Sequence, residues 1–103
     1  MNESNPNKPS NPSESNDTPV VIVYTAAFCG YCAGAKNLLS KKGVEFTEIR
    51  IDKEAGKREE MEQRAQRDSV PQIFIGDRHI GGFDDLVDLD MDDELDPLLG
   101  ISE

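Results

Sequence analysis

The strongest constraint in the sequence is a pair of cysteines, Cys29 and Cys32, which stand between a strand pattern and a helix pattern. Residues 20–24 form an apolar, β-branched run that is typical of a buried strand. Residues 33–42 carry their apolar side chains at helical spacing. The pair is therefore predicted at a strand-to-helix turn, with Cys29 near the N-cap and Cys32 in the first helical turn.

A thiolate is chemically favoured at such a turn. Backbone N–H groups at the start of a helix have no partner within the helix, and the helix dipole places partial positive charge there. Both effects stabilise a thiolate relative to its thiol. A C-x-x-C pattern beside a βαβ pattern therefore predicts thiol–disulfide redox chemistry.

Two other interpretations of the cysteine pair remain open. A structural disulfide that spans two residues would add little loop-closure entropy. A zinc site would need further ligands, and the single histidine, His79, lies 50 residues after Cys29. Redox chemistry is the interpretation that the pattern favours.

Composition divides the 103 residues into two parts. Residues 1–18 are polar apart from Met1 and are predicted to be a disordered tail, whereas residues 19–103 are predicted to form one small domain. The tail has no secretory-signal or transit-peptide pattern, and no apolar run is long enough to span a bilayer. We therefore expect a cytoplasmic protein in a reducing compartment, with its cysteines as free thiols.

The net charge of −10 is concentrated at the C-terminal end, where residues 84–103 include nine acidic residues and no basic one. Negative charge of this kind argues against nucleic acid as a partner, and no membrane partner is expected. We interpret the acidic segment as a solvated surface in preference to a docking site.

A second strand and a second helix are predicted after the first helix. The apolar residues of 44–51 change parity part-way, which indicates an edge strand with a bulge or twist. Residues 57–66 form a highly charged helix, and Asp52 is placed to cap it. Two strands joined through a helix in this way predict a parallel βαβ unit.

The remaining chain predicts a β-hairpin over residues 69–82, which turns at Gly76-Asp77. A last helix opens at Phe83 or Asp84. The predicted fold class is α/β, with a small mixed four-stranded sheet flanked by helices in the order β-α-β-α-β-β-α.

Three blocks of sequence together resemble the dithiol glutaredoxins of bacterial type. They are residues 29–32 (CGYC), 69–75 (SVPQIFI) and 81–85 (GGFDD). C-x-x-C alone is shared with thioredoxins and metal sites, but the three blocks at this spacing are specific. The resemblance covers residues 20–99 and implies a thioredoxin-like fold.

The resemblance also implies roles for individual residues. Cys29 corresponds to the nucleophile and Cys32 to the resolving thiol. The Val70-Pro71 peptide corresponds to a cis-proline loop, whose backbone pairs with the cysteine residue of glutathione. The glutathione-binding set implied in this way is Tyr31, Arg67, Ser69, Val70, Pro71, Gly82 (with Gly81 beside it), Phe83, Asp84 and Asp85.

Within that set, each part of glutathione has an implied partner. The N–H groups of Phe83 and Asp84 correspond to those that hold the γ-glutamyl carboxylate, and Asp85 receives the ammonium group. Tyr31 lines the thiol groove, and Arg67 supplies positive charge near the glycyl carboxylate.

The activity that the resemblance implies is a glutathione-dependent thiol–disulfide oxidoreductase, which reduces protein disulfides and glutathione mixed disulfides. The alternative is a dimer that holds a [2Fe–2S] cluster through Cys29 of each chain and two glutathione molecules. Glutathione and disulfide-bearing or glutathionylated proteins are the expected partners of a chain that is otherwise monomeric. Two positions depart from the usual pattern: Ala26 stands where relatives carry lysine, and Gly30 where many carry proline.

Overall fold

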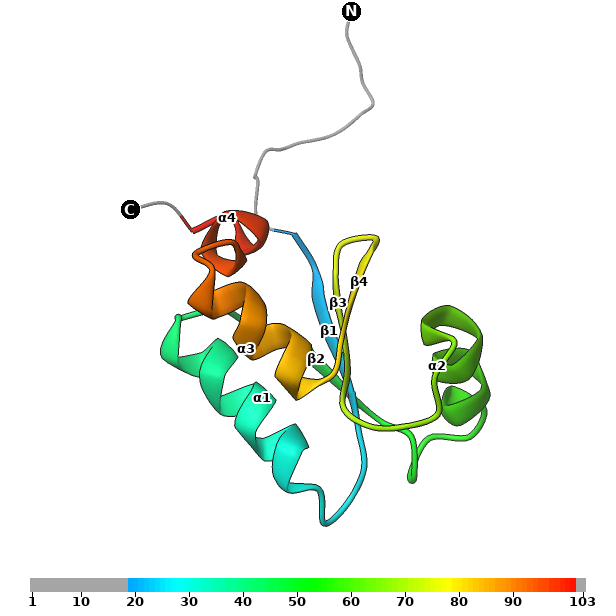
Figure 1. Cartoon of the computed structure of the whole chain (residues 1–103). Helices are drawn as coiled ribbons and strands as arrows, with labels where there is room; N and C mark the ends of the chain where they lie inside the picture. The colour runs from blue at the N-terminus through cyan, green and yellow to red at the C-terminus, as the bar shows by residue number, and fades with distance from the viewer. Residues whose placement is uncertain (1–18, 102–103) are drawn as a thin grey trace, which may run out of the picture.

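The computed structural model describes residues 19–101, so the tail predicted for residues 1–18 lies outside the described part of the chain. None of the helices in this part is long and apolar enough to cross a bilayer. Figure 1 shows the arrangement of the elements. Their bounds are β1 (Val21–Thr25), α1 (Gly30–Lys41), β2 (Thr47–Arg50), α2 (Lys57–Ala65), β3 (Gln72–Ile75), β4 (Arg78–Gly81), α3 (Phe83–Met91) and α4 (Leu95–Leu99).

The four strands form one mixed sheet, as predicted, and their order in the sheet is β2-β1-β3-β4. β1 is parallel to β2 and antiparallel to β3, and β3 is antiparallel to β4. Tyr24 near the end of β1 lies opposite Gln72 at the start of β3. Ile73 in turn lies opposite Gly81 at the end of β4. The end of β1, the start of β3 and the end of β4 therefore meet at one end of the sheet.

Helices cover both faces of this sheet, with α1 and α3 on one face and α2 on the other (Figure 1). Because side chains alternate along a strand, β1 sends Val21 and Val23 to one face and Tyr24 to the other. The larger core consists of Val21, Val23, Ala35, Leu39, Ile73, Ile75, Ile80, Leu86, Leu95 and Leu99. The smaller core, under α2, consists of Tyr24, Ile51, Met61, Ala65 and Phe74.

β2 is an edge strand, as predicted, and of the two predicted alternatives, a bulge or a twist, the bulge is absent. Its residues pair with β1 in unbroken parallel register. Phe46, just before the strand, packs against the larger core, whereas Ile49 packs against the smaller one. The apolar residues change parity because the two ends of this segment are buried against opposite faces of the sheet.

Only two residues of α2, Met61 and Ala65, are buried, so apolar packing alone attaches this helix weakly to the sheet. Polar contacts add to it. The Tyr24 hydroxyl donates to Glu60 Oε2 at 2.5 Å and accepts a hydrogen bond from Arg64 at 2.9 Å. The Arg64 guanidinium also lies 4.2 Å from the centroid of the Phe74 ring, which is a cation–π arrangement. The buried phenol thus links α2 to the centre of the sheet.

Asp52 does not cap α2, contrary to the prediction; the helix starts after Gly56, which has a φ of 80°. Asp52 instead pairs with Arg50 at 2.8 Å and accepts a hydrogen bond from the Ala27 N–H at 3.2 Å. Hydrogen bonding from Arg50 lowers the pKa of Asp52 to about 2. An ionised carboxylate therefore stabilises the loop that leads to Cys29.

A fourth helix, α4, follows the predicted last helix, so the predicted order was one helix short. Leu95 and Leu99, the first and last residues of α4, are buried in the larger core. Pro97 is its third residue, where the N–H that proline lacks would have no partner within the helix. A single turn of this kind is too short to show a helical period in the sequence.

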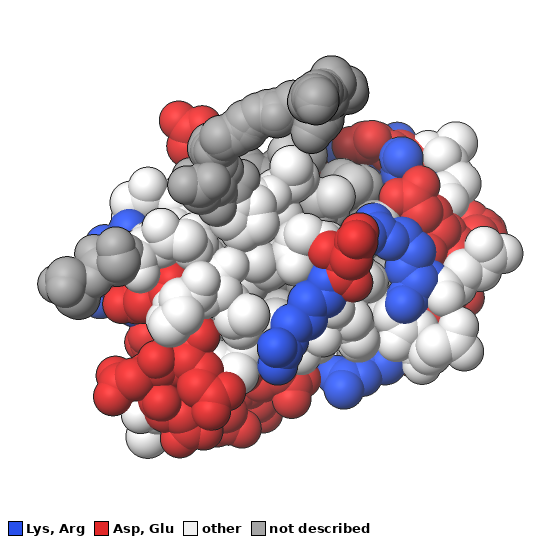
Figure 2. All heavy atoms as spheres, turned by 90° about the horizontal axis from the view of Figure 1, so that it is seen from above, with Lys and Arg blue, Asp and Glu red and all other residues white. Residues whose placement is uncertain are grey.

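Acidic side chains gather on one side of the end that carries α4 (Figure 2). Exposed ones in this part of the chain are Asp88, Asp92, Asp93 and Glu94. Lys42, at the C-cap of α1, pairs there with Asp90 and Asp96, each at 2.7 Å. These two ion pairs raise the pKa of Lys42. One lysine therefore offsets negative charge where α1, α3 and α4 come together.

The contacts of Tyr24 predict a measurable effect on stability. Tyr24→Phe removes a hydroxyl that makes two hydrogen bonds, so we expect the free energy of unfolding to fall by about 1–2 kcal/mol. Urea denaturation with an unchanged m-value measures this loss. Gln63→Ala, at an exposed position of α2, is the matched control and should leave the midpoint unchanged. Equal midpoints for Tyr24→Phe and the unmodified protein would contradict this account of how α2 is attached.

Candidate active site

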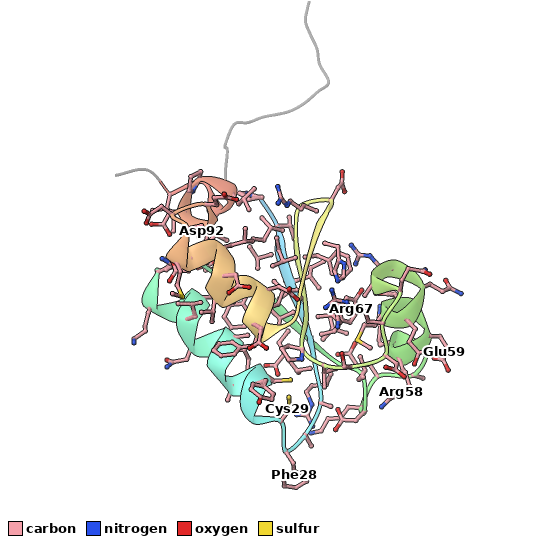
Figure 3. All side chains as sticks on the ribbon, in the orientation of Figure 1. Phe28, Cys29, Arg58, Glu59, Arg67 and Asp92 are labelled. Atoms are coloured by element: carbon pink, nitrogen blue, oxygen red, sulfur yellow. The ribbon has the colours of Figure 1, made fainter. Side chains whose placement is uncertain are left out.

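Cys29 is the N-cap of α1, and Cys32 lies in the first turn, as predicted. The Cys29 sulfur accepts a hydrogen bond from the Cys32 N–H at 3.2 Å, so a free amide at the helix start points at it. On its other side the thiol faces the Val70 carbonyl oxygen at 3.8 Å. Cys29 is only half-buried and lies at the end of the sheet where β1 finishes (Figure 3).

Cys32 has a different environment, although both cysteines are free thiols. Its side chain is buried, with 2% of its surface exposed. Burial raises the pKa of the Cys32 thiol to about 12, and the hydrogen bond with Cys29 acts in the same direction. At neutral pH Cys32 is therefore a protonated thiol shielded from solvent, whereas Cys29 is accessible.

The loop before β3 forms the wall that faces Cys29. The Val70-Pro71 peptide bond is cis, as the resemblance implied. Ser69 and Val70 precede the strand at the end of the sheet where β1 finishes, because β1 and β3 are antiparallel.

The segment between β4 and α3 forms a third side of the site. Gly81 has a φ of 116°, a conformation that favours glycine. Asp85 accepts a hydrogen bond from the Gly82 N–H at 2.9 Å, which caps α3, and pairs with Arg67 at 3.1 Å. The Gly82 hydrogen bond, followed by that from Arg67, lowers the pKa of Asp85. This corner of the site thus carries the Asp84 and Asp85 carboxylates, the Arg67 guanidinium and the N–H groups of a helix start.

These three segments enclose a groove with a volume of about 300 Å³. The rings of Tyr31 and Phe83 lie along it with their centroids 6.1 Å apart. The structure brings together all nine residues of the expected glutathione-binding set. The residues that line the groove are Tyr31, Arg67, Ser69, Val70, Pro71, Gly82, Phe83, Asp84 and Asp85.

Two features near Cys29 were not predicted from the sequence. Phe28 is fully exposed at a φ of 57° and points away from the body of the domain (Figure 3). The hydrogen bond from the Ala27 N–H to Asp52 joins the cysteine loop to the end of β2. No local pattern signals either feature, since one is a backbone conformation and the other joins residues that are distant in sequence.

Within residues 19–101, no group of three or more His, Cys, Asp and Glu side chains is arranged to hold a metal ion.

The contrast between the two thiols predicts selective alkylation. At about pH 8, iodoacetamide should modify Cys29 and leave Cys32 intact, because a raised pKa keeps a thiol protonated and burial blocks access to it. Peptide mass spectrometry locates the adduct. Cys29→Ser is the control and should stay unmodified over the same period. Comparable alkylation of Cys32 in the unmodified protein would contradict this assignment.

The two glycines before α3 predict opposite effects on stability. A Cβ on Gly81 would overlap the Asp85 carboxylate and force a strained φ, so Gly81→Ala should reduce the free energy of unfolding by about 2 kcal/mol or more. A Cβ on Gly82 would meet its nearest neighbour, the Pro71 carbonyl oxygen, at 3.7 Å in an extended conformation. Gly82→Ala is therefore the matched control and should unfold close to the unmodified protein. Thermal denaturation compares the two variants, and equal losses would contradict the assigned role of Gly81.

Comparison with known proteins agrees with this geometry. The family model for glutaredoxin matches residues 21–80. Glutaredoxin 3 of Escherichia coli strain K12 is 58% identical over 79 residues, which cover 77% of this chain and 95% of that protein.

Solved structures give the same result. A buckwheat glutaredoxin–glutathione complex superposes with a TM-score of 0.74 at 31% identity, over 82% of this chain and 83% of that one. The solution structure of glutaredoxin from Brucella melitensis gives a TM-score of 0.73 at 46% identity, over 84% and 94% of the two chains. The chain therefore belongs to the glutaredoxin family of thiol–disulfide oxidoreductases, with a thioredoxin-like fold.

Proposed function

We propose that this protein is a glutathione-dependent oxidoreductase that reduces glutathione mixed disulfides and protein disulfides through Cys29 and Cys32. The observation that carries the proposal is the position of the Cys29 sulfur, 3.8 Å from the Val70 carbonyl of the groove wall. A peptide bound along this wall presents its own sulfur to the thiol.

The polar groups of the groove match those of glutathione. Glutathione carries two carboxylates, one ammonium group and one thiol on a peptide-like chain. The N–H groups of Phe83 and Asp84 at the start of α3 suit its γ-glutamyl carboxylate. The Asp85 carboxylate suits its ammonium group, and the Arg67 guanidinium suits its glycyl carboxylate. Arg67 and Asp85 are half-exposed, so their own ion pair is weak and yields readily to a ligand.

Reduction of a glutathione mixed disulfide then takes two exchange steps. The Cys29 thiolate attacks the glutathione-side sulfur, a Cys29–glutathione disulfide forms, and the substrate protein leaves as a thiolate that takes up a proton. The thiolate of a second glutathione attacks the bound glutathione sulfur. Glutathione disulfide leaves and Cys29 is again a thiolate. Each turnover consumes one free glutathione, which leaves as glutathione disulfide together with the glutathione that the substrate carried.

Reduction of a protein disulfide uses Cys32 in the second step. Cys29 first forms a mixed disulfide with the substrate protein. Cys32 gives up its proton and attacks the Cys29 sulfur, which releases the second sulfur of the substrate as a thiolate that takes up a proton, and a Cys29–Cys32 disulfide remains. Two glutathione molecules then return both cysteines to thiols and leave as glutathione disulfide. Because burial and the hydrogen bond with Cys29 keep Cys32 protonated before this, the thiol is held back until the mixed disulfide has formed.

The two steps predict different outcomes for the two serine variants. Cys29→Ser should lose all turnover. Cys32→Ser should keep reduction of a glutathionylated peptide and lose reduction of a protein disulfide. An assay coupled to glutathione reductase, run on both substrates, measures these rates. Equal loss in the two variants on the glutathionylated peptide would contradict the proposed roles.

A second candidate function, favoured by Gly30, is the binding of a [2Fe–2S] cluster between two chains. Apart from its chain neighbours, a Cβ at Gly30 would meet no atom within 4 Å, so the space around the residue next to Cys29 is open. Such a cluster needs four thiolate ligands. Cys29 of each chain and two glutathione thiols would supply them.

Anaerobic reconstitution tests this second function by its absorbance. With iron, sulfide and excess glutathione, a coloured dimeric species should form in the unmodified protein and in Cys32→Ser, but not in Cys29→Ser. Gly30→Pro, which fills the open space, should reduce the yield. A colourless monomer under all these conditions would contradict cluster binding.

A further inference from the structure

Gln72, the first residue of β3, has a fully buried polar side chain and directly follows Pro71, which lines the groove. A buried amide is costly unless it is hydrogen-bonded. Its Nε2 donates to the Ser69 carbonyl oxygen at 3.0 Å and lies 3.3 Å from the Ser69 hydroxyl. Gln72 does not line the groove, but it holds a residue that does.

His79 on β4 completes this contact. Because the Ser69 carbonyl can only accept, it fixes the NH₂ end of the Gln72 amide toward Ser69. The Gln72 Oε1 must then accept from His79 Nε2, which lies 2.7 Å away and so carries a proton. The imidazole is held in place by the Phe74 ring, with the two centroids 4.9 Å apart. A directed series of hydrogen bonds thus runs from His79 through Gln72 to Ser69.

This series ends beside the nucleophile. Ser69 is followed by Val70, whose carbonyl faces the Cys29 sulfur at 3.8 Å. Among the described residues, none of the backbone–backbone hydrogen bonds that order loops and turns involves residues 67–71. The Gln72 amide therefore supplies the hydrogen bond that holds Ser69 in this wall, while Val70 packs against the smaller core.

We propose that Gln72 and His79 are positioning residues: through Ser69 they fix the groove wall at the distance from Cys29 that glutathione requires. The inference rests on the proposed function, because it assigns glutathione to this groove. Neither residue touches the ligand. Loss of the His79 donor leaves the buried Gln72 Oε1 without its hydrogen bond, and the amide then holds Ser69 less firmly in the wall.

The test compares two substitutions of His79, which is only part-buried and can be replaced without opening the core. His79→Phe keeps a ring to stack on Phe74 but removes the donor. His79→Gln supplies an N–H donor in place of the imidazole. Because His79→Phe loses one hydrogen bond, we expect its KM for a glutathionylated peptide to rise by roughly three- to tenfold. Because the wall contacts glutathione equally in the ground and transition states, kcat should stay within about twofold, and His79→Gln should restore KM.

A stability control separates positioning from general loosening. Leu98→Ala removes a partly buried side chain in α4, at the opposite end of the sheet from Cys29. It should lower the melting temperature without changing KM. An unchanged KM in His79→Phe would overturn the proposal, as would an equal rise in His79→Gln or in Leu98→Ala.

Backbone order parameters from NMR relaxation test the same proposal without glutathione. The order parameters of the Ser69 and Val70 amides should be lower in His79→Phe than in the unmodified protein and should recover in His79→Gln. If the protein turned over no glutathionylated substrate, the proposed function would fail, and these order parameters would still decide whether the network holds the wall. Identical order parameters in all three proteins would overturn the inference.

Discussion

The antiparallel pairing of β1 with β3 is the constraint on which the site depends. It places Tyr24, near the end of β1, opposite Gln72, at the start of β3. The loop before β3 therefore lies beside the loop that carries Cys29. Pairing of β3 with β4 brings the end of β4, and hence the start of α3, to the same end of the sheet. Three segments that are distant in sequence form one groove because of this register.

Burial of β1 on both faces fixes that register. Val23 packs under α1 and α3, while Tyr24 packs under α2. A shift by one residue would exchange these side chains and place the Tyr24 hydroxyl away from Glu60 and Arg64. Two further hydrogen bonds order the loops of the site. The Asp52 carboxylate accepts from the Ala27 N–H in the cysteine loop, and the Asp85 carboxylate caps α3. The thiol chemistry thus rests on a sheet whose two faces are held in different ways, one by apolar packing and one largely by polar contacts.

The sequence predicted the elements with strong local signals. The C-x-x-C between a strand and a helix placed Cys29 at the N-cap, and Gly76-Asp77 marked the hairpin. The groove residues came from the resemblance of three blocks, since no periodicity relates Arg67 to Asp85. Predictions failed where a partner distant in sequence decides the outcome. Asp52 binds the Ala27 N–H instead of capping α2. The apolar residues around β2 change parity because they are buried on opposite faces of the sheet, which the local sequence does not reveal. The helix α4 is too short to show a helical period in the sequence.

A crystal structure of the trapped intermediate would show whether glutathione lies in this groove with its sulfur on Cys29. The disulfide between Cys29 and glutathione can be accumulated in Cys32→Ser, which has no resolving thiol. We expect the γ-glutamyl carboxylate at the N–H groups of Phe83 and Asp84, and the backbone of the glutathione cysteine paired with Val70. Glutathione bonded to Cys29 but lying outside the groove, without contact to Val70 or the start of α3, would contradict this expectation.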